Sequence, residues 1–307
     1  MNEIVFEITP EMEDERIDKC ISTFIDSLSR SYIQKIIKDG NVYVNDKAVK
    51  ANYKVKMEDY VRFILPDSVE PDIPPQDIPL DIIYEDKDIL IVNKPKNMVV
   101  HPAPGHYEGT LVNAVMFHCK DDLSGINGVM RPGIVHRIDK DTTGSLIICK
   151  NDEAHNSIAE QLKIHSITRK YRAIVFGNIK NDEGIINAPI GRHPNDRKKM
   201  AINERNGKPA ITHYKVLERF DKYTYIECQL ETGRTHQIRV HMSSIGHPLI
   251  GDTVYTNQKA PFHLEGQTLH AMVIGFEHPS KGEYMEFEAP LPDYFEKLLN
   301  ILRNSKK

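Results

Sequence analysis

The first part of the chain has apolar residues at three- and four-residue steps, the spacing of one face of an α-helix. The pattern predicts a helix over residues 13–28 and a shorter one over 31–38, which Gly40 would end as a C-terminal cap. Apolar runs on both sides of Asn45-Asp46 predict a strand, a tight turn and a strand. With a further strand expected at 60–65, this segment indicates a small α/β domain.

A proline-rich segment follows this first domain. Five prolines stand between positions 66 and 79. Proline cannot continue a helix interior or a central strand, so neither element is expected there. The segment predicts a linker over residues 66–80, between an N-terminal domain (1–65) and a larger domain (81–307). Two domains also suit a chain of 307 residues.

Beyond the linker, short apolar runs predict more strands than helices. Helices are expected over 111–117, 154–164 and 293–302, and strands over 82–84, 89–92, 145–149, 171–176, 211–217, 224–230, 272–276 and 285–287. Many strands with few helices between them are typical of a mixed, mostly antiparallel sheet with flanking helices. The predicted fold class is therefore α+β: the small α/β domain, then this mixed-sheet domain.

The net charge of -4 is unevenly distributed along the chain. Residues 30–56 hold seven Lys and Arg against two acidic residues, and residues 166–208 hold ten against four. Because association with a polyanion depends on local patches, the acidic total does not exclude a nucleic-acid partner. A solvated charged surface explains either window alone equally well.

The sequence favours a cytoplasmic location. No apolar stretch approaches the length of a membrane span, and the N-terminus lacks the basic start and apolar run of a signal peptide. The four cysteines lie far apart without a CxxC pair, which argues against a zinc ribbon, a redox motif and a secreted disulfide framework. We therefore expect a cytoplasmic protein that does not contact a membrane.

Residues 136–144, His-Arg-Ile-Asp-Lys-Asp-Thr-Thr-Gly, are the densest cluster of charged and titratable side chains. They lie between two apolar runs, as do functional loops held by a rigid scaffold. A salt-bridged turn is the structural alternative. The spacing Asp139-x-Asp141-x-Thr143 also matches a phosphatase nucleophile pattern, but no Gly-rich phosphate loop or paired acids for Mg²⁺ accompany it.

Two further segments carry candidate chemistry. Residues 231–241, Glu-Thr-Gly-Arg-Thr-His-Gln-Ile-Arg-Val-His, fit a helix as well as an extended chain, so the element stays open. Their two histidines lack an HExxH pattern or a nearby cysteine, which disfavours a metal site. Residues 168–172, Thr-Arg-Lys-Tyr-Arg, combine positive charge with an aromatic ring, which suits phosphate contact and base stacking. A lone strand tyrosine is the structural alternative.

Together these segments resemble the RluA/RluD-type pseudouridine synthases. Residues 136–144 are similar to the family signature HRLDxxTSG, with Ile138 for the usual Leu and Thr143 for the common Ser. Further family-like segments follow in the family's order: Lys170-Tyr171, residues 233–241 and residues 246–252, with Asn93-Lys94-Pro95 and residues 99–102 matching its early part. The resemblance covers about residues 80–300, and residues 13–60 are similar to an S4 RNA-binding domain.

The resemblance implies an RNA pseudouridine synthase that needs neither cofactor nor metal. The family places the catalytic carboxylate at Asp139, with Arg239 as its ion partner and Tyr171 against the target uracil. Glycosidases use carboxylates against a similar developing charge on the sugar. The branch to which the chain is most similar implies that the targets are uridines of large-subunit (23S) rRNA, as free rRNA or in an assembling 50S particle. A monomeric enzyme is favoured.

The resemblance also implies RNA contacts outside these three residues. Substrate binding is expected from Arg137, Arg234, Arg169, Lys170 and His136, with Arg137 filling the stack that a flipped nucleotide leaves. In the N-terminal domain, RNA binding is expected from Arg30, Lys35, Lys38 and Lys47. Structural ion pairing is the alternative for the arginines. The alternative functions are the same chemistry on tRNA and a non-catalytic RNA-binding protein.

Overall fold

The computed structural model divides the chain into two compact units, Met1–Glu70 and Pro71–Lys307. It describes residues 2–25, 30–65, 73–103, 106–120, 122–126, 131–196, 198–260 and 262–305. Of the predicted linker, residues 66–72 lie outside this description. Residues 73–80 contain neither helix nor strand, but Ile73 is buried in the core of the second unit. That part of the segment therefore packs on the second unit, and the predicted domain boundaries stay predictions.

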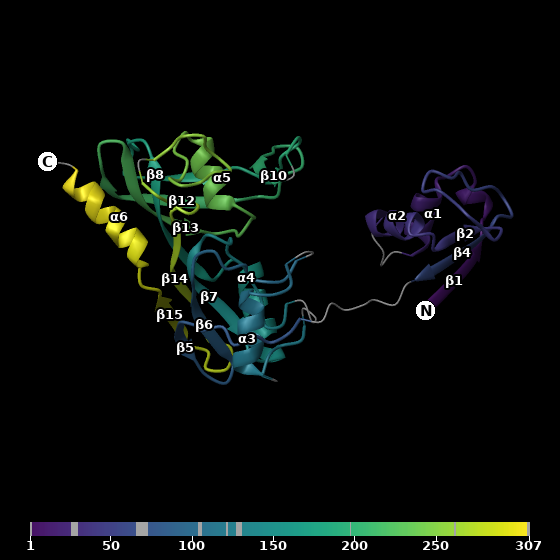
Figure 1. Ribbon diagram of the computed structural model, residues 1–307, viewed down its shortest axis with the longest axis horizontal. Helices are drawn as coiled ribbons and strands as arrows, with labels where there is room; N and C mark the ends of the chain where they lie inside the picture. The colour runs from purple at the N-terminus through teal and green to yellow at the C-terminus, as the bar shows by residue number, and fades with distance from the viewer. Residues whose placement is uncertain are drawn as a thin grey trace. The chain divides into compact units, whose positions relative to one another are not determined.

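The N-terminal unit is an antiparallel sheet with strand order β1-β4-β2-β3 and two helices (Figure 1). Its elements are β1 (Asn2–Glu7), the short 3-10 helix η1 (Pro10–Met12), α1 (Ile17–Phe24), α2 (Arg30–Lys38), β2 (Val42–Val44), β3 (Lys47–Ala48) and β4 (Tyr60–Leu65). Asn45 and Asp46 join β2 to β3 with φ of 48° and 60°, the left-handed conformation of a tight hairpin turn. The predicted strand, turn and strand are confirmed.

The first helix is shorter than the prediction over 13–28. Asp14 has a φ of 61°, and Arg16 is extended at the N-cap of α1. The backbone N–H groups of Asp14 and Ile17 donate to Val55 O and Tyr53 O at 2.9 and 2.8 Å. These bonds to a distant segment set where α1 begins, and apolar spacing does not reveal them. Residues 26–29, the end of the predicted helix, lie outside the described residues.

The second unit is built on one nine-stranded sheet with the order β5-β6-β7-β14-β8-β13-β12-β9, and β15 pairs with β14. Its elements are β5 (Ile82–Glu85), β6 (Ile89–Lys94), α3 (Leu111–Cys119), β7 (Thr143–Cys149), α4 (Asp152–Lys163), β8 (Thr168–Phe176), β9 (Glu183–Asn187), β10 (Ile190–Arg192), β11 (Met200–Ile202), β12 (Ile211–Arg219), β13 (Tyr223–Leu230), α5 (Gln237–Ser244), β14 (Leu269–Glu277), β15 (Tyr284–Glu288) and α6 (Asp293–Asn304). Among the described strands, β7 and β14 pair in parallel and the other pairs are antiparallel. The predicted mixed, mostly antiparallel sheet is confirmed.

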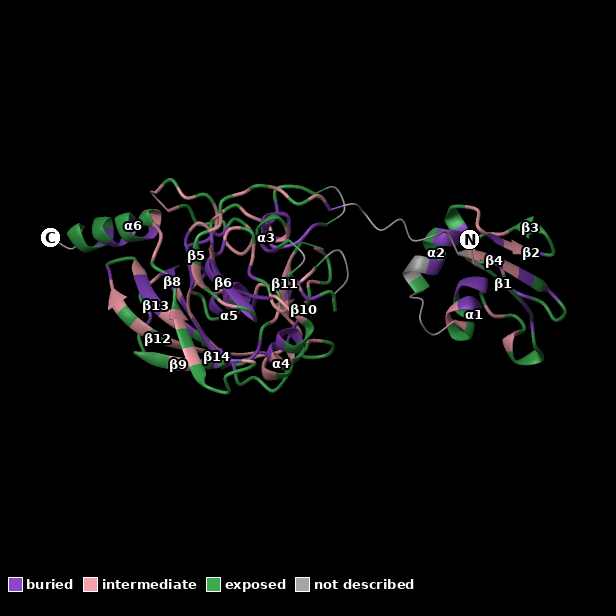
Figure 2. Cartoon of the chain, turned by 90° about the horizontal axis from the view of Figure 1, so that it is seen from below, coloured by how far each residue is buried: buried purple, intermediate pink, exposed green. Residues whose placement is uncertain are grey.

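The central strands are buried on both faces of this sheet. Leu90 and Val92 of β6 join the core beneath α3, whereas Ile89 and Ile91 join the core beneath α4. Because successive strand residues point to opposite faces, such a strand needs an unbroken apolar run. Figure 2 shows β6 buried, while the edge strand β9 is largely exposed.

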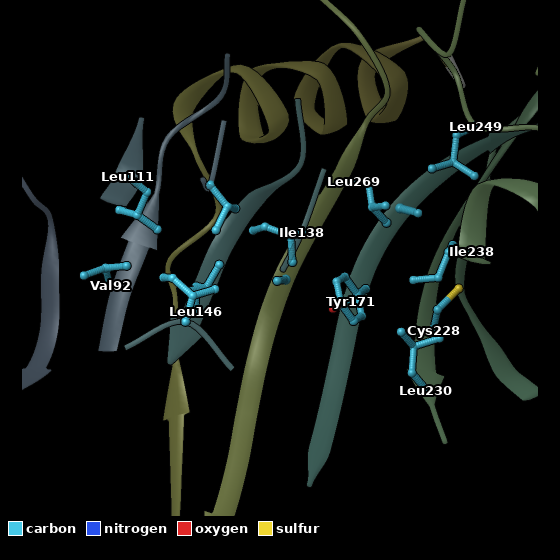
Figure 3. Close-up of a cluster of buried hydrophobic side chains, with 14 of the residues drawn as sticks. Val92, Leu111, Ile138, Leu146, Tyr171, Cys228, Leu230, Ile238, Leu249 and Leu269 are labelled. Atoms are coloured by element: carbon cyan, nitrogen blue, oxygen red, sulfur yellow. The ribbon is translucent and has the colours of Figure 1, made fainter. Parts of the chain in front are cut away.

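The core beneath α3 extends to the segments that carry the candidate chemistry. It includes Ile138 of the loop before β7, Tyr171 of β8 and Ile238 of α5 (Figure 3). The opposite face of the sheet holds α6, whose Phe295 packs against Ile174 of β8. Within the described part of the chain, no helix combines the length and the apolar character needed to cross a membrane.

Candidate active site

The loop before β7, residues 134–142, has its polar side chains on a buried support. The Ile138 side chain is in the core, and the Ile147 N–H donates to His136 Nε2 at 3.0 Å. Burial lowers the pKa of His136 to about 3, so the neutral ring accepts this bond. Lys94 Nζ donates to the Lys140 carbonyl at 3.0 Å. These contacts fix the backbone on either side of Asp139.

The C-terminal end of this loop is fixed by the contact between β7 and β14. The Thr143 hydroxyl donates to His270 Nδ1 at 2.8 Å, while His270 Nε2–H donates to Ala289 O at 3.1 Å. Gly144 follows with a φ of 110°, and a Cβ there would lie 2.3 Å from Ala271 O. Only glycine combines that φ with so close an approach of two backbones.

Asp139 is held by a buried guanidinium. Arg239 Nη1 donates to Asp139 Oδ2 at 2.9 Å, and Arg239 Nε and Nη2 donate to Asp252 Oδ2 and Oδ1 at 2.7 and 3.0 Å. Burial opposes the charge of Arg239, but hydrogen bonds and ion pairing with Asp252 and Asp139 outweigh it and raise its pKa. A permanently charged Arg239 therefore stabilises and orients the Asp139 carboxylate.

Tyr171 lies on β8, with its ring in the middle of the apolar cluster that contains Ile138 and Leu230 (Figure 3). Its side chain is 8% exposed, and burial raises the pKa of its phenol. The group is therefore neutral at neutral pH. Two positions earlier on the same face, Arg169 Nη2 donates to Glu231 O at 2.9 Å. A flat apolar ring with a cation beside it suits contact with a base and its phosphate.

Two cavities lie on either side of Asp139. The first has a volume of about 570 Å³ and is lined by Tyr171 and Arg234, among others. The second has a volume of about 390 Å³. Arg137, Asp139 and Arg239 line both. Both volumes fall in the range of small-ligand pockets, and the first is large enough for a nucleotide taken out of its stack.

The segments that form this site also match a known family. A family model described as RNA pseudouridylate synthase matches residues 88–244, which contain the loop, Tyr171 and Arg239. The chain belongs to the RNA pseudouridylate synthase family. An S4 domain model matches residues 27–61 of the N-terminal unit. The predicted family and enzyme class are confirmed: the protein is an RNA pseudouridine synthase.

Two sequence relatives of this pseudouridine synthase align with it over almost the full length of both chains. It is 55% identical to the uncharacterized RNA pseudouridine synthase YlyB of Bacillus subtilis, over 99% of this chain and 100% of that protein. It is 45% identical to ribosomal large subunit pseudouridine synthase D of Zymomonas mobilis, over 98% of both. Human RNA pseudouridylate synthase domain containing 1 is a structural neighbour with a TM-score of 0.57 and 26% identity, covering 75% of this chain and 97% of that one.

The structure brings most of the predicted site residues of this pseudouridine synthase together. Of the predicted residues, those that line the first cavity are Asp139, Tyr171, Arg239, Arg137, Arg169, Arg234 and His136. Lys170 does not line either cavity, because side chains alternate along β8 and it points away from the face of Tyr171. Its predicted substrate contact therefore has no support from this geometry. His136 and Arg234 already bond backbone groups, the latter through Nε to Pro209 O at 2.9 Å.

The predicted RNA-binding residues of the N-terminal unit are exposed: Arg30, Lys35, Lys38 and Lys47. Arg30 has a second role, because its Nε and Nη2 donate to the buried carboxylate of Asp18 at 3.2 and 3.1 Å. Burial opposes the charge of Asp18, but hydrogen bonds from Arg16, Gln34 and Arg30 outweigh it and lower its pKa. Arg30 is therefore held in place by an ion pair, while more than a third of its side chain faces solvent.

Three residues of this site were not predicted from the sequence. Asp252 holds Arg239, Tyr255 packs over Arg239 with the guanidinium carbon 5.1 Å from its ring centre, and His236 lines both cavities. His236 lies inside the family-like segment 233–241, and Asp252 is the last residue of the segment 246–252. Both residues therefore belong to segments that the sequence had already indicated. Their roles depend on contacts between segments far apart in the chain, which spacing does not show.

One group of metal-ligand residues is brought together within the described residues: Asp86, Asp88 and His278. His278 Nε2 lies 2.7 Å from Asp86 Oδ2, Lys281 pairs with the same oxygen at 3.3 Å, and the Ser280 hydroxyl donates to Asp88. These side chains bond one another, and none of them lines either cavity. The group therefore connects the β5–β6 turn to the β14–β15 turn.

Proposed function

We propose that this pseudouridine synthase modifies uridines of large-subunit (23S) rRNA, as free rRNA or in an assembling 50S particle. Its support is the likeness to ribosomal large subunit pseudouridine synthase D of Zymomonas mobilis and of Pseudomonas aeruginosa, at 45% and 42% identity over 98% of this chain. The N-terminal match to an S4 domain agrees with an extended RNA substrate. We also propose a monomer, and a location in the reducing cytoplasm, where four free cysteines such as these stay reduced.

The observation that supports the catalytic assignment is the Asp139–Arg239 pair between two cavities. Conversion of uridine to pseudouridine breaks the N1–C1′ bond, turns the uracil and forms a C5–C1′ bond. The C5 proton is lost and N1 gains one, so no electrons are exchanged and no co-substrate is consumed. The sugar carbon becomes electron-poor in between. A fixed, ionised carboxylate beside it is the group this step needs.

Two roles are open to Asp139. In the first, it attacks C1′ as the N1–C1′ bond breaks, and it leaves C1′ as the C5–C1′ bond forms. In the second, it takes a proton from C2′ as the N1–C1′ bond breaks, which gives a glycal, and it returns that proton to C2′ when C5 adds to C1′. In both, a full negative charge is needed at the start. Arg239 supplies the opposite charge at 2.9 Å from Asp139 Oδ2, and this contact fixes the carboxylate in a half-buried site.

The other lining residues would bind the extruded nucleotide. The face of Tyr171 packs against uracil, and the rigid strand β8 fixes that ring where the base must turn. Arg137, which is exposed at the rim of both cavities, occupies the space that the flipped nucleotide leaves in the RNA stack. Arg234 and Arg169 contact the phosphates on either side of the target.

The N-terminal unit would add affinity without choosing the target. Lys35, Lys38 and Lys47 are exposed cations on one small domain. Contacts of this kind to phosphates raise affinity for RNA of any sequence and weaken as salt increases. The selected uridine is then determined by what fits the cavity at Asp139.

Mapping of pseudouridine tests the substrate. Purified protein is incubated with large-subunit rRNA transcript, with tRNA and with immature 50S particles, each beside an Asp139→Ala control. New pseudouridine in large-subunit rRNA or particles with the wild-type protein alone is the expected result. Product on tRNA alone overturns the rRNA assignment and keeps the enzyme. Tight binding to each RNA without product from any of them favours the non-catalytic RNA-binding alternative.

A further inference from the structure

His236 stands in the wall between the two cavities in an unusual backbone conformation. It is the N-cap of α5 with φ 57° and ψ 22°, in the left-handed region, and it lines both cavities. Non-glycine residues in this region are uncommon and concentrate at functional sites, where the surrounding structure holds them. The backbone of the Thr-His-Gln segment thus turns the imidazole towards Asp139.

The imidazole is oriented by Tyr255. His236 Nδ1 lies 2.8 Å from the Tyr255 hydroxyl, and the rings meet edge to face at 85° with centres 5.7 Å apart. The same hydroxyl accepts the Met200 N–H at 2.9 Å. Its own proton is then available for Nδ1, which leaves the proton of a neutral imidazole on Nε2. That tautomer also turns an N–H, and not a lone pair, towards the Asp139 carboxylate.

The second carboxylate oxygen of Asp139 faces this N–H across a gap. Arg239 bonds Oδ2, whereas His236 Nε2 faces Oδ1 at 3.9 Å. That separation exceeds hydrogen-bond length, so the two groups do not satisfy each other directly. A single oxygen about 2.8 Å from each would accept the N–H and donate its own proton to the carboxylate. The gap therefore fits a hydroxyl group, which is both donor and acceptor.

Burial supports a neutral donor at this position. It lowers the pKa of His236, and Arg239 lowers it further, while Asp139 acts in the opposite direction. The ring is therefore uncharged at neutral pH and leaves Arg239 as the cation that pairs with Asp139. A neutral N–H also binds a hydroxyl without competing for the carboxylate charge.

We propose that His236 Nε2–H and Asp139 Oδ1 together hold the 2′-hydroxyl of the target uridine. This inference rests on the proposed function, because it takes the ribose of that uridine to lie beside Asp139. The 2′-hydroxyl is the ribose hydroxyl adjacent to C1′, and it is the group that distinguishes RNA from DNA. Holding it places C1′ and C2′, the two atoms on which Asp139 would act, against the carboxylate.

Two RNAs that differ only at the target test the proposal. One carries uridine and the other 2′-deoxyuridine, and each is assayed with wild-type protein and His236→Asn. Asparagine tolerates a positive φ but is too short to reach the gap. The expected result is a loss of about 10- to 100-fold in kcat/KM for His236→Asn on the uridine RNA. On the 2′-deoxyuridine RNA the loss is expected below about threefold, because the partner group is already missing.

Dissociation constants are measured for the same pairs, and they replace the rates if the 2′-deoxyuridine RNA gives no product. His263→Asn is the matched control, since His263 is exposed and lines neither cavity. Equal losses on the two RNAs overturn the proposal and place His236 against a base or phosphate. If His236→Asn fails to fold, Tyr255→Phe takes its place, and an unchanged preference for the 2′-hydroxyl counts against the proposal. Absence of product from wild type on the uridine RNA contradicts the proposed function instead.

Discussion

Asp252 is predicted to act on the reaction without touching the RNA. It lines neither cavity and is 2% exposed, yet it accepts two of the three hydrogen bonds by which Arg239 is fixed. The third goes to Asp139. Asp252→Asn removes the charge and replaces one carboxylate oxygen by a donor that faces the guanidinium. Arg239 must then turn, and the end that holds Asp139 moves with it.

Two magnitudes follow from this geometry. Breaking one side of a buried ion pair lowers the free energy of unfolding by about 3 kcal/mol. If Asp139 is the catalytic group as proposed, a displacement of about 1 Å at its carboxylate should lower kcat by about 100-fold, while the KM for RNA should stay within about threefold. The assay is release of tritium from RNA labelled at uracil C5, because the C5 hydrogen leaves when the new bond forms. Thermal unfolding is measured on the same samples.

A double mutant tests whether Asp252 acts on kcat through Arg239. If Asp252 acts only through Arg239, then adding Asp252→Asn to Arg239→Met lowers kcat no further. Asp88→Asn is the matched control. Like Asp252, Asp88 is buried, accepts hydrogen bonds and lines neither cavity. It should reduce stability and leave kcat unchanged. An unaltered kcat in folded Asp252→Asn would show that Asp252 does not position the Asp139 carboxylate through Arg239.

Changes at Gly144, Asp18 and Lys38 should affect stability or RNA binding in measurable ways. Gly144→Ala places a Cβ 2.3 Å from Ala271 O at a φ of 110°, so it should lower the free energy of unfolding by more than about 1 kcal/mol, measured by denaturant titration. Because the pKa of Asp18 is lowered in the fold, its contribution to stability is present above the ordinary aspartate pKa and is lost as pH falls below it. Asp18→Asn should therefore flatten the acid limb of the stability profile of the full chain, and an unchanged limb would count against that ion pair. Lys38→Ala should reduce the slope of log affinity against log salt by about 0.7 to 0.9, with kcat at saturating RNA unchanged; a slope equal to wild type would show that Lys38 contacts no phosphate.

Much of the fold could be predicted because its signal is local. The run Ile89-Leu90-Ile91-Val92 is apolar on both faces, so it indicates a strand covered on both sides, and the structure has it between α3 and α4. The helix α6 carries Phe295 and Leu299 on one stripe and was predicted almost to its ends. In both cases the burial pattern is fixed by neighbours in the sequence.

Two groups of strands were missed for different reasons. In β1, Ile4 and Phe6 alternate with exposed residues, so the strand pattern was present in the sequence and was overlooked. The hairpin of β10 and β11 is three residues on each side, which is too short to show such a pattern. The segment of α5 stayed open between helix and strand because His236 begins it with a positive φ that the sequence does not encode visibly.

Some residues of the site could likewise be predicted from the sequence and others could not. Asp139, Tyr171 and Arg239 were predicted because the resemblance names those positions, and the structure brings all three to one cavity. Lys170 was included for its charge, but the alternation of β8 takes it to the other face. Asp252 was overlooked because its importance depends on a bond to a residue thirteen positions earlier on another element.

We propose that the Asp139 carboxylate, paired with Arg239, performs the chemistry of the reaction. The most direct test is a single-turnover measurement of C5 tritium release with wild type and Asp139→Asn on the same large-subunit rRNA fragment. Asparagine keeps the shape and removes the charge and the nucleophile. We expect RNA affinity within a few-fold of wild type and no detectable release from the variant. Release by Asp139→Asn at a rate near that of wild type would mean that another group performs the chemistry.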